Sequence, residues 1–280
     1  DGMLTGTGMA EMKPVCMLML YCAEEFEREN INAGRLAYFF NPEEEISSTH
    51  FRPLIEEYIK KSRMVACAEP VRANGAYVNQ RKGAMRYTFD FHGIAAHSGN
   101  NPKDGACAVT ELSHWVLALK DLENDDKGIT VNAGIITGGT SVNTVPDYAQ
   151  LKVDIRMREV QDAFDLEKTI AGMKPFNPKV RVEMTGGTTR PPMVPDKNTE
   201  KMIAVVNKLC EKYDIEPKWT NSGGGSDASF ASAMGVPALC GLSARGKGCH
   251  SPDEVMCLDD LERRYGIFMD MLKEFSGLQF

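Results

Sequence analysis

Hydrophobic positions follow two different patterns along this chain of 280 residues. Up to about residue 78, and again from about residue 188, short apolar runs alternate with stretches of helical spacing. Residues 79–187 instead carry strands in which apolar and polar side chains alternate, as they do when one face of a sheet is exposed. We therefore predict one α/β domain, residues 1–78 and 188–280, interrupted by an inserted domain over residues 79–187.

The chain opens with a Gly-rich turn that is followed by a predicted helix. Met17, Leu20 and Tyr21 fall at helical spacing, and Pro14 is compatible with a helix when it lies in the first turn. The sequence therefore predicts a helix that begins close to Pro14.

Two short apolar runs follow, with a helical stretch between them. The runs "RLAYFF" and "RMVACAEP" are typical of buried strands. The intervening "RPLIEEYIKKS" predicts a surface helix that turns Leu54, Ile55 and Tyr58 inward. This strand–helix–strand order indicates parallel strands in one sheet.

Four strands and two helices make up the predicted inserted domain. The strands are "AMRYTFDFHG", "ITVNAGIITGG", "AQLKVDIRM" and "KVRVEMTGG". Helical stretches cover residues 106–122 and 160–173. The resulting order, β-α-β-β-α-β, is that of a small ferredoxin-like sandwich.

The α/β pattern resumes after a Pro-rich connector. An amphipathic helix over "TEKMIAVVNKLCEKY" is followed by a buried strand in "GVPALCGLS". The last helix, residues 258–275, is expected to place Leu261, Tyr265, Phe268 and Leu272 on one face.

Charge and composition exclude several classes of function. The net charge is −7 and no run is rich in Lys and Arg, which argues against a nucleic-acid surface. No apolar stretch is long enough to cross a bilayer, and no secretory signal is visible. The eight cysteines contain no Cys-x-x-Cys pair, so we expect buried thiols in a reducing compartment and a cytoplasmic protein.

Three consecutive glutamates, Glu43, Glu44 and Glu45, come directly after the apolar run that ends at Phe40. A helix N-terminus would explain them, because carboxylates complement the helix dipole there. A bound cation would explain them too. Glu69 ends the next predicted strand, and ligands of open α/β sheets gather at the carboxyl ends of strands. The position of Glu69 therefore favours a bound cation over a helix N-terminus as the explanation.

Two Gly-rich segments later in the chain add to this set. In "GGGSDASFAS" a turn and an N-cap explain Ser226 and Asp227, whereas three consecutive glycines indicate close approach of the backbone to a ligand. In "GKGCHSPDE", His250 follows an apolar strand. Carboxylates with one histidine suit Zn²⁺, or Co²⁺ and Mn²⁺ as substitutes. Hydrolysis would also need a carboxylate that is not a ligand, to accept a proton.

These motifs, in this order and spacing, resemble one family along nearly the whole chain. It comprises dinuclear zinc peptidases and amidohydrolases such as glutamate carboxypeptidase, acetylornithine deacetylase, succinyl-diaminopimelate desuccinylase and aminoacylase. The motifs are most similar to those of the glutamate carboxypeptidase branch. The segments that carry the resemblance are "GTGMAEMK", "NPEEEISS", "CAEP", "GIAAHSGNNPKDGACAV", "SVNTVPDYAQLKVDIRM", "SGGGSDASFAS" and "GKGCHSPDE".

The resemblance implies a fold and a role for each matching residue. The fold would be a zinc-exopeptidase-like mixed sheet flanked by helices, with a ferredoxin-like α+β lid or dimerisation domain inserted. Glu44 would be the general base, and His97 would reach across a homodimer to stabilise the oxyanion. The metal ligands would be Glu11, Glu45, Glu69 and His250, and the substrate-binding residues Asn143, Arg156, Gly223, Gly224 and Gly225.

The activity that the resemblance implies is metal-assisted hydrolysis of an amide bond, with two Zn²⁺ ions per subunit in the family. The substrate would be a small peptide or N-acyl amino acid with a free carboxylate, and a glutamate-type leaving group is favoured. Arg156 suits such a substrate because its guanidinium binds a carboxylate with two hydrogen bonds.

Two departures from the family pattern favour a different reading, a relative that binds or dimerises without catalysis. The early His-x-Asp ligand motif is absent, and Glu11 stands where the family has a bridging Asp. One ion or none is then expected. Because residues 1–78 would be an N-terminally truncated first part of the catalytic domain, we expect either a partner segment that covers the exposed sheet edge or a chain that folds poorly alone. A Ser or Cys hydrolase has little support, because no Gly-x-Ser-x-Gly elbow occurs.

Overall fold

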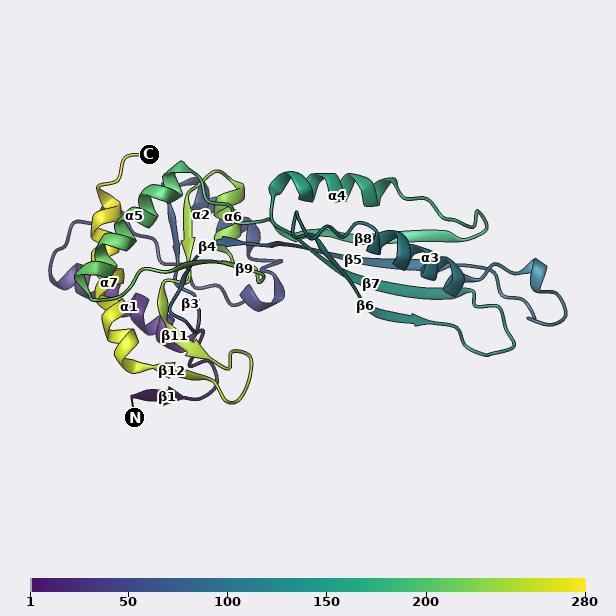
Figure 1. Ribbon diagram of the computed structural model, residues 1–280, viewed down its shortest axis with the longest axis horizontal. Coiled ribbons are helices and arrows are strands. Elements are labelled where there is room, and N and C mark those ends of the chain that lie inside the picture. The colour runs from purple at the N-terminus through teal and green to yellow at the C-terminus, as the bar shows by residue number, and fades with distance from the viewer. Residues whose placement is uncertain (1) are drawn as a thin grey trace. The chain divides into compact units, whose positions relative to one another are not determined.

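The computed structural model describes residues 2–280, which form two compact units (Figure 1). Of the described residues, unit 1 contains 2–81 and 193–280, and unit 2 contains 82–192. The second unit is therefore an insertion within the first.

Unit 1 contains two four-stranded sheets with mixed strand directions. Parallel pairs are β2–β10, β3–β11 and β4–β9, and antiparallel pairs are β1–β12, β11–β12 and β4–β10. The first sheet has the order β1 (Met3–Thr5), β12 (Val255–Cys257), β11 (Ser243–Lys247), β3 (Pro70–Val71), and the second the order β2 (Val65–Cys67), β10 (Ala238–Cys240), β4 (Tyr77–Arg81), β9 (Trp219–Ser222).

The larger core of unit 1 lies under three long helices. Pro14 is in the first turn of α1, as predicted, and Asp196 caps α5 by accepting hydrogen bonds from Asn198 N and Thr199 N. The core includes Leu18 and Phe26 of α1. The helices of this unit are α1 (Lys13–Arg28), α2 (Arg52–Lys60), α5 (Lys197–Lys212), α6 (Ala228–Ala233) and α7 (Leu258–Ser276), with a 3₁₀ turn, η1, at Glu44–Ile46.

Several predicted details of unit 1 are wrong. "RLAYFF" forms no strand: residues 31–41 are irregular, and Leu36 and Phe40 are exposed. No sheet of the described chain offers this segment a partner, and a short apolar run does not specify a strand by itself. Leu54 and Tyr58 of α2 are also exposed, and the helix buries Ile55 and Ile59 instead.

The apolar face predicted for α1 is likewise exposed. Met17, Leu20 and Tyr21 are about half accessible, and the buried stripe runs through Leu18 and Cys22. Both faces of this helix are apolar, so spacing alone could not decide which one packs on the sheet. In α7, by contrast, the predicted face is confirmed: Phe268 is buried, and Leu261, Tyr265 and Leu272 pack against the same core.

Unit 2 is the predicted ferredoxin-like sandwich. Its four strands form an antiparallel sheet in the order β6-β7-β5-β8, and their alternating pattern buries one face under the helices. Glu111 is buried and accepts hydrogen bonds from Trp115 Nε1, Phe176 N and Asn177 N, each at 2.8 Å. The elements are β5 (Gly83–His92), α3 (Ala108–Lys120), β6 (Thr130–Gly138), β7 (Tyr148–Met157), α4 (Val160–Gly172) and β8 (Arg181–Arg190), with a short 3₁₀ turn, η2, at Pro102–Asp104.

All eight cysteines are free thiols, and Cys22, Cys210 and Cys240 are buried. Within residues 2–280, every helix is too short or too polar to cross a bilayer.

Candidate metal centre and catalytic site

Three of the predicted ligands converge in unit 1. His250 Nε2 lies 3.1 Å from Glu11 Oε2 and 3.3 Å from Glu45 Oε2. Each offers one ligand atom, and these atoms all lie within 4.8 Å of one another. Three segments that are distant in sequence therefore meet at one point.

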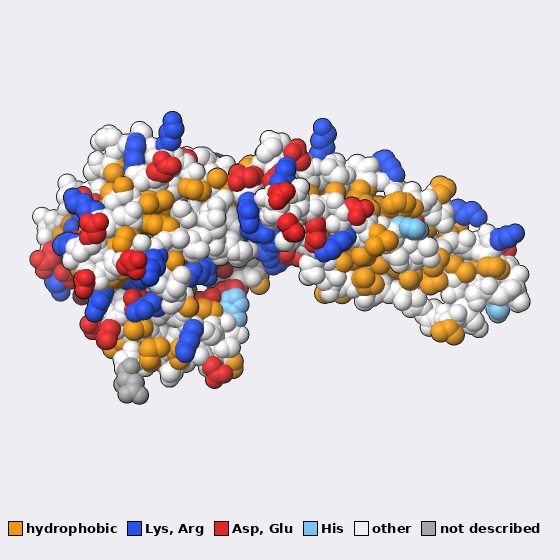
Figure 2. All heavy atoms as spheres, in the orientation of Figure 1, with side chains coloured by type: hydrophobic (Ala, Val, Ile, Leu, Met, Phe, Trp, Pro, Cys, Tyr) orange, Lys and Arg blue, Asp and Glu red, His pale blue; other side chains and the backbone are white. Residues whose placement is uncertain are grey.

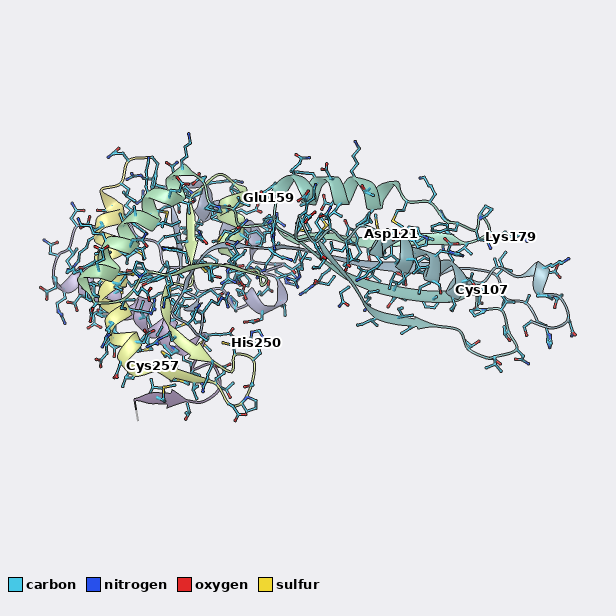
Figure 3. The ribbon with its side chains drawn as sticks, in the orientation of Figure 1. Cys107, Asp121, Glu159, Lys179, His250 and Cys257 are labelled. Carbon is cyan, nitrogen blue, oxygen red and sulfur yellow. The ribbon has the colours of Figure 1, made fainter. Side chains whose placement is uncertain are left out.

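Each of the three ligands comes from a loop or turn. Glu11 lies immediately before α1, Glu45 lies in η1, and His250 lies in the loop between β11 and β12, where Figure 3 labels it. The backbone of His250 has a φ of +65°, in the left-handed region that few residues other than glycine adopt. The side chain of Glu11 is 24% exposed, and those of Glu45 and His250 are about two-thirds exposed. The site is therefore open to small ligands from solvent.

The three consecutive glutamates have different roles. Glu43 accepts hydrogen bonds from His50 N at 2.8 Å, Phe51 N at 3.3 Å and His50 Nδ1 at 2.7 Å. Desolvation opposes ionisation, but these hydrogen bonds outweigh it and hold the pKa of Glu43 below its ordinary value. Because Phe51 is the N-cap of α2, the helix-terminus explanation holds for Glu43, while Glu45 lies beside Glu11 and His250.

The turn that carries Glu44 and Glu45 is fastened by Asp227. Asp227 accepts hydrogen bonds from Asn41 Nδ2 and from Ser48 Oγ, the latter at 2.7 Å, and Asn41 Nδ2 also donates to Ser48 Oγ at 2.7 Å. Asp227 makes no side-chain cap to α6, so the predicted capping role is wrong. Its carboxylate instead ties together the two ends of the glutamate turn.

Glu69 is placed between β2 and β3, outside the group of three. Burial raises the pKa of Glu69 to about 8, with a further increase from Cys240 that Arg81 opposes. The negative charges of Glu44 and Glu11 raise it further, so Glu69 belongs to the same electrostatic cluster. Burial also raises the pKa of Glu11, against the attraction of His250. Carboxylates with raised pKa values gain from a nearby cation.

The glycine loop 223–225 is held by Arg81, a residue that the sequence did not single out. The Nη1 atom of Arg81 donates to Gly224 O at 3.1 Å and Gly225 O at 2.9 Å, and the side chain is buried. An added Cβ at Gly223 would meet no atom within 4 Å, so packing against the rest of the chain does not require glycine at that position.

In unit 2 the structure brings His97 and Asn143 together. His97 pairs with Thr144 in an isolated bridge, and Ser98 N donates to Asn143 O at 3.0 Å. The Nδ1 atom of His97 accepts hydrogen bonds from the backbone N–H groups of Gly99 and Asn100, at 3.1 and 3.2 Å. In the neutral ring the proton is therefore on Nε2, which can donate to a substrate oxygen.

Arg156 lies at the opposite end of the unit 2 sheet. It is paired with Ala84 at the start of β5, whereas the His97 and Asn143 loops follow the far ends of β5 and β6. Its guanidinium already contacts Asp154 through two hydrogen bonds, of 2.6 and 2.9 Å. Within one unit 2, these three predicted residues do not form one site.

Comparison with known proteins identifies the family. The model of peptidase family M20/M25/M40 matches residues 1–274. The chain belongs to the M20/M25/M40 peptidase family. Among curated relatives, carboxypeptidase G2 from Pseudomonas sp. strain RS-16 is 28% identical over 257 residues, which cover 88% of this chain. The chain spans only 60% of the length of that relative.

Solved structures confirm the fold of this member of the M20/M25/M40 peptidase family. A tripeptidase from Staphylococcus aureus has a TM-score of 0.82 at 20% identity, covering 99% of this chain and 75% of its own. A dinuclear metal-binding M20 peptidase from Bacillus subtilis has a TM-score of 0.70 at 13% identity, covering 94% and 71%. The mixed sheets flanked by helices, and the inserted sandwich, are therefore those of the family.

The residues at the cluster have the chemistry of metal ligands. Glu11, Glu45 and His250 supply two carboxylates and one imidazole, a donor set that suits Zn²⁺. Across residues 2–280, this is the one group of at least three acidic, Cys or His side chains with ligand atoms so close together. The described residues therefore include three side chains that could hold one ion, and Glu69 lies outside this group.

Proposed function

We propose that this M20/M25/M40 peptidase is a metal-dependent hydrolase of the carboxypeptidase type, which cleaves an amide bond beside an amino acid with a free carboxylate. The observation that carries the proposal is the convergence of Glu11, Glu45 and His250 within 4.8 Å. Glu44 is adjacent to Glu45 in η1, so a further carboxylate is available beside the ligands.

The chain's own residues divide the work of hydrolysis. A Zn²⁺ ion held by Glu11, Glu45 and His250 would supply positive charge that acidifies water and polarises the amide carbonyl. Glu44 would take a proton from the attacking water and deliver it to the leaving amine. His97 would donate from Nε2 to the carbonyl oxygen as negative charge develops there. Its tautomer, fixed by two backbone N–H groups, suits that donation.

A glutamate-type leaving group is favoured because the motifs resemble those of the glutamate carboxypeptidase branch. Carboxypeptidase G2, a carboxypeptidase by name, is 28% identical over most of this chain. Asn143 and the 223–225 loop would bind the substrate. Asp154 accepts hydrogen bonds from Nε and Nη2 of Arg156, so the guanidinium would bind the substrate carboxylate through Nη1 and the remaining hydrogen of Nη2.

A homodimer through unit 2 would bring His97 and Asn143 to the active site of a second subunit. The exposed side chains of Ile135 and Ile136 lie on the edge strand β6, and Leu117 of α3 is 65% exposed. Figure 2 shows hydrophobic side chains gathered over the α3 face of this unit. An unpaired edge with apolar neighbours is suited to pairing with another copy. Ile136→Lys should then shift the protein to monomer in light scattering.

Metal analysis and hydrolysis assays together test the proposal. The purified chain should bind about one Zn²⁺, and His250→Ala or Glu45→Ala should abolish that binding. His50→Ala is the matched control, because His50 is an exposed histidine that contacts Glu43. Glu44→Gln should keep the metal and lose hydrolysis of N-acyl glutamates and dipeptides. Absence of bound metal in the unsubstituted chain would refute the hydrolase and favour binding without catalysis.

A further inference from the structure

One buried carboxylate contacts the backbone beside two of the three ligands. Glu254 lies directly before β12 and is 4% exposed. Its Oε1 accepts a hydrogen bond from His250 N at 3.2 Å, and its Oε2 accepts one from Ala10 N at 3.1 Å. Ala10 immediately precedes Glu11, so each carboxylate oxygen holds the backbone at or next to one ligand.

The surroundings of Glu254 make this link rigid. The turn before α1 packs closely on β11: a Cβ added at Gly246 would come within 2.8 Å of Ala10 Cβ. The backbone of Glu254 also accepts a hydrogen bond from Gly6 N at 3.0 Å. The carboxylate therefore lies in a close-packed region, where a shift of one ligand backbone would be transmitted to the other.

The charge of Glu254 has no basic partner close by. Among residues 2–280, no Lys, Arg or His side chain forms an ion pair with it, and its negative charge raises the pKa of Glu11. A buried carboxylate without a cation is costly. A cation held by Glu11 and His250 would offset that cost, because it would lie close to all three residues.

We propose that Glu254 is a positioning residue of the metal centre, which fixes the spacing between Glu11 and His250 and adds negative charge behind them. This inference rests on the proposed function, since it takes Glu11 and His250 to be metal ligands. Glu254 contacts neither substrate nor ion in this role, and it acts through the backbone of its neighbours. Residues that orient metal ligands commonly change metal affinity by about 10- to 100-fold when they are replaced.

The test is the affinity for Zn²⁺ of folded Glu254→Gln. Glutamine has the shape of glutamate but only one acceptor oxygen, so one of the two N–H groups would face an NH₂ group. We expect the Kd for Zn²⁺, measured by competition with a chelator, to rise about 10- to 100-fold. Without metal, amide hydrogen exchange should become faster at Ala10 or His250.

The matched control is Asp260→Asn. Asp260 is buried to a similar degree in the same unit and accepts a backbone hydrogen bond from Arg245 N at 2.7 Å. Unlike Glu254, it forms ion pairs, with the side chains of Arg245 and Arg264, and it accepts no hydrogen bond from Ala10 or His250. This variant should lose stability and keep the Zn²⁺ affinity of its folded fraction. It separates a specific effect on the centre from a general loss of packing.

The outcomes distinguish this inference from the proposed function. If the unsubstituted chain binds no Zn²⁺, the proposed function fails and the inference with it. If that chain binds Zn²⁺ and Glu254→Gln binds it equally well, or if Asp260→Asn weakens binding to the same extent, only the positioning role is overturned. Unchanged exchange at both Ala10 and His250 would also overturn it.

Discussion

Replacing Glu69 by Gln should remove a large part of the pH dependence of stability that the metal-free protein shows. Burial, followed by the influence of Cys240, raises the pKa of Glu69 in the folded chain from an ordinary value of 4.5 to about 8. The folded state therefore binds a proton over a pH range in which the unfolded state has lost it. Stability from this proton is fully present below about pH 4.5 and is lost as the pH rises through about 8.

The size of the effect follows from these two pKa values. Between them the folded state holds one more proton than the unfolded state, so the free energy of unfolding falls by about 1.4 kcal/mol per pH unit. Integrated between about pH 5.5 and 7.5, the loss is about 2.5 kcal/mol. Glutamine cannot ionise, so Glu69→Gln should lack this contribution.

Urea unfolding in excess chelator measures the free energy directly. The unsubstituted chain and Glu69→Gln would be compared at about pH 5.5, 6.5 and 7.5. As the pH rises over this range, the free energy of unfolding of the variant should increase by about 2.5 kcal/mol relative to that of the unsubstituted chain. Glu27→Gln, an exposed position of α1, is the control and should give a constant difference. A pH-independent difference for Glu69→Gln would show that Glu69 is ionised throughout and would refute the reasoning.

Two other predictions concern groups that prepare the site. Asp227→Ala leaves Asn41 and Ser48 without their shared acceptor. The free energy of unfolding, measured with urea, should fall by about 1–3 kcal/mol, and the affinity for Zn²⁺, measured by chelator titration, should be weaker. Unchanged affinity would show that the turn keeps its shape without Asp227. For His97, nitrogen chemical shifts of the neutral ring should report a proton on Nε2, because two backbone N–H groups donate to Nδ1; a proton on Nδ1 would contradict the proposed oxyanion donor.

Much of unit 2 could be predicted because its signal is local. The alternation over "AMRYTFDFHG" has the period of a half-exposed strand, and β5 covers Gly83–His92 with one buried face. "RLAYFF" has no such period. Its apolar character is equally compatible with a strand and with an irregular segment. Periodicity thus predicted the fold where one face is exposed, and failed where both faces of a segment are apolar, as in α1.

The sequence was sufficient to predict the candidate metal ligands, but it did not predict the residues that position them. Glu45 and His250 belong to motifs, and the structure brings them together. Asp227 was interpreted as a helix cap because caps are the commonest role of Asp at a helix start. Its partners, Asn41 and Ser48, lie 186 and 179 residues away. Contacts at such separation depend on the complete fold, and no local pattern indicates them.

Glu11 shows how a departure from the family pattern can be compatible with metal binding. The resemblance places a bridging Asp at this position, and the side chain of Asp is shorter than that of Glu by one methylene group. In the structure Oε2 of Glu11 lies 3.1 Å from His250 Nε2, so Glu11 joins Glu45 and His250 in the group that could hold a metal ion. Its charge still raises the pKa of Glu69, but Glu69 lies outside the three-ligand group. With Glu at position 11, three side chains are therefore placed where they could hold one ion, while Glu69, predicted to bind a second ion, has a pKa of about 8 and is mainly protonated near neutral pH.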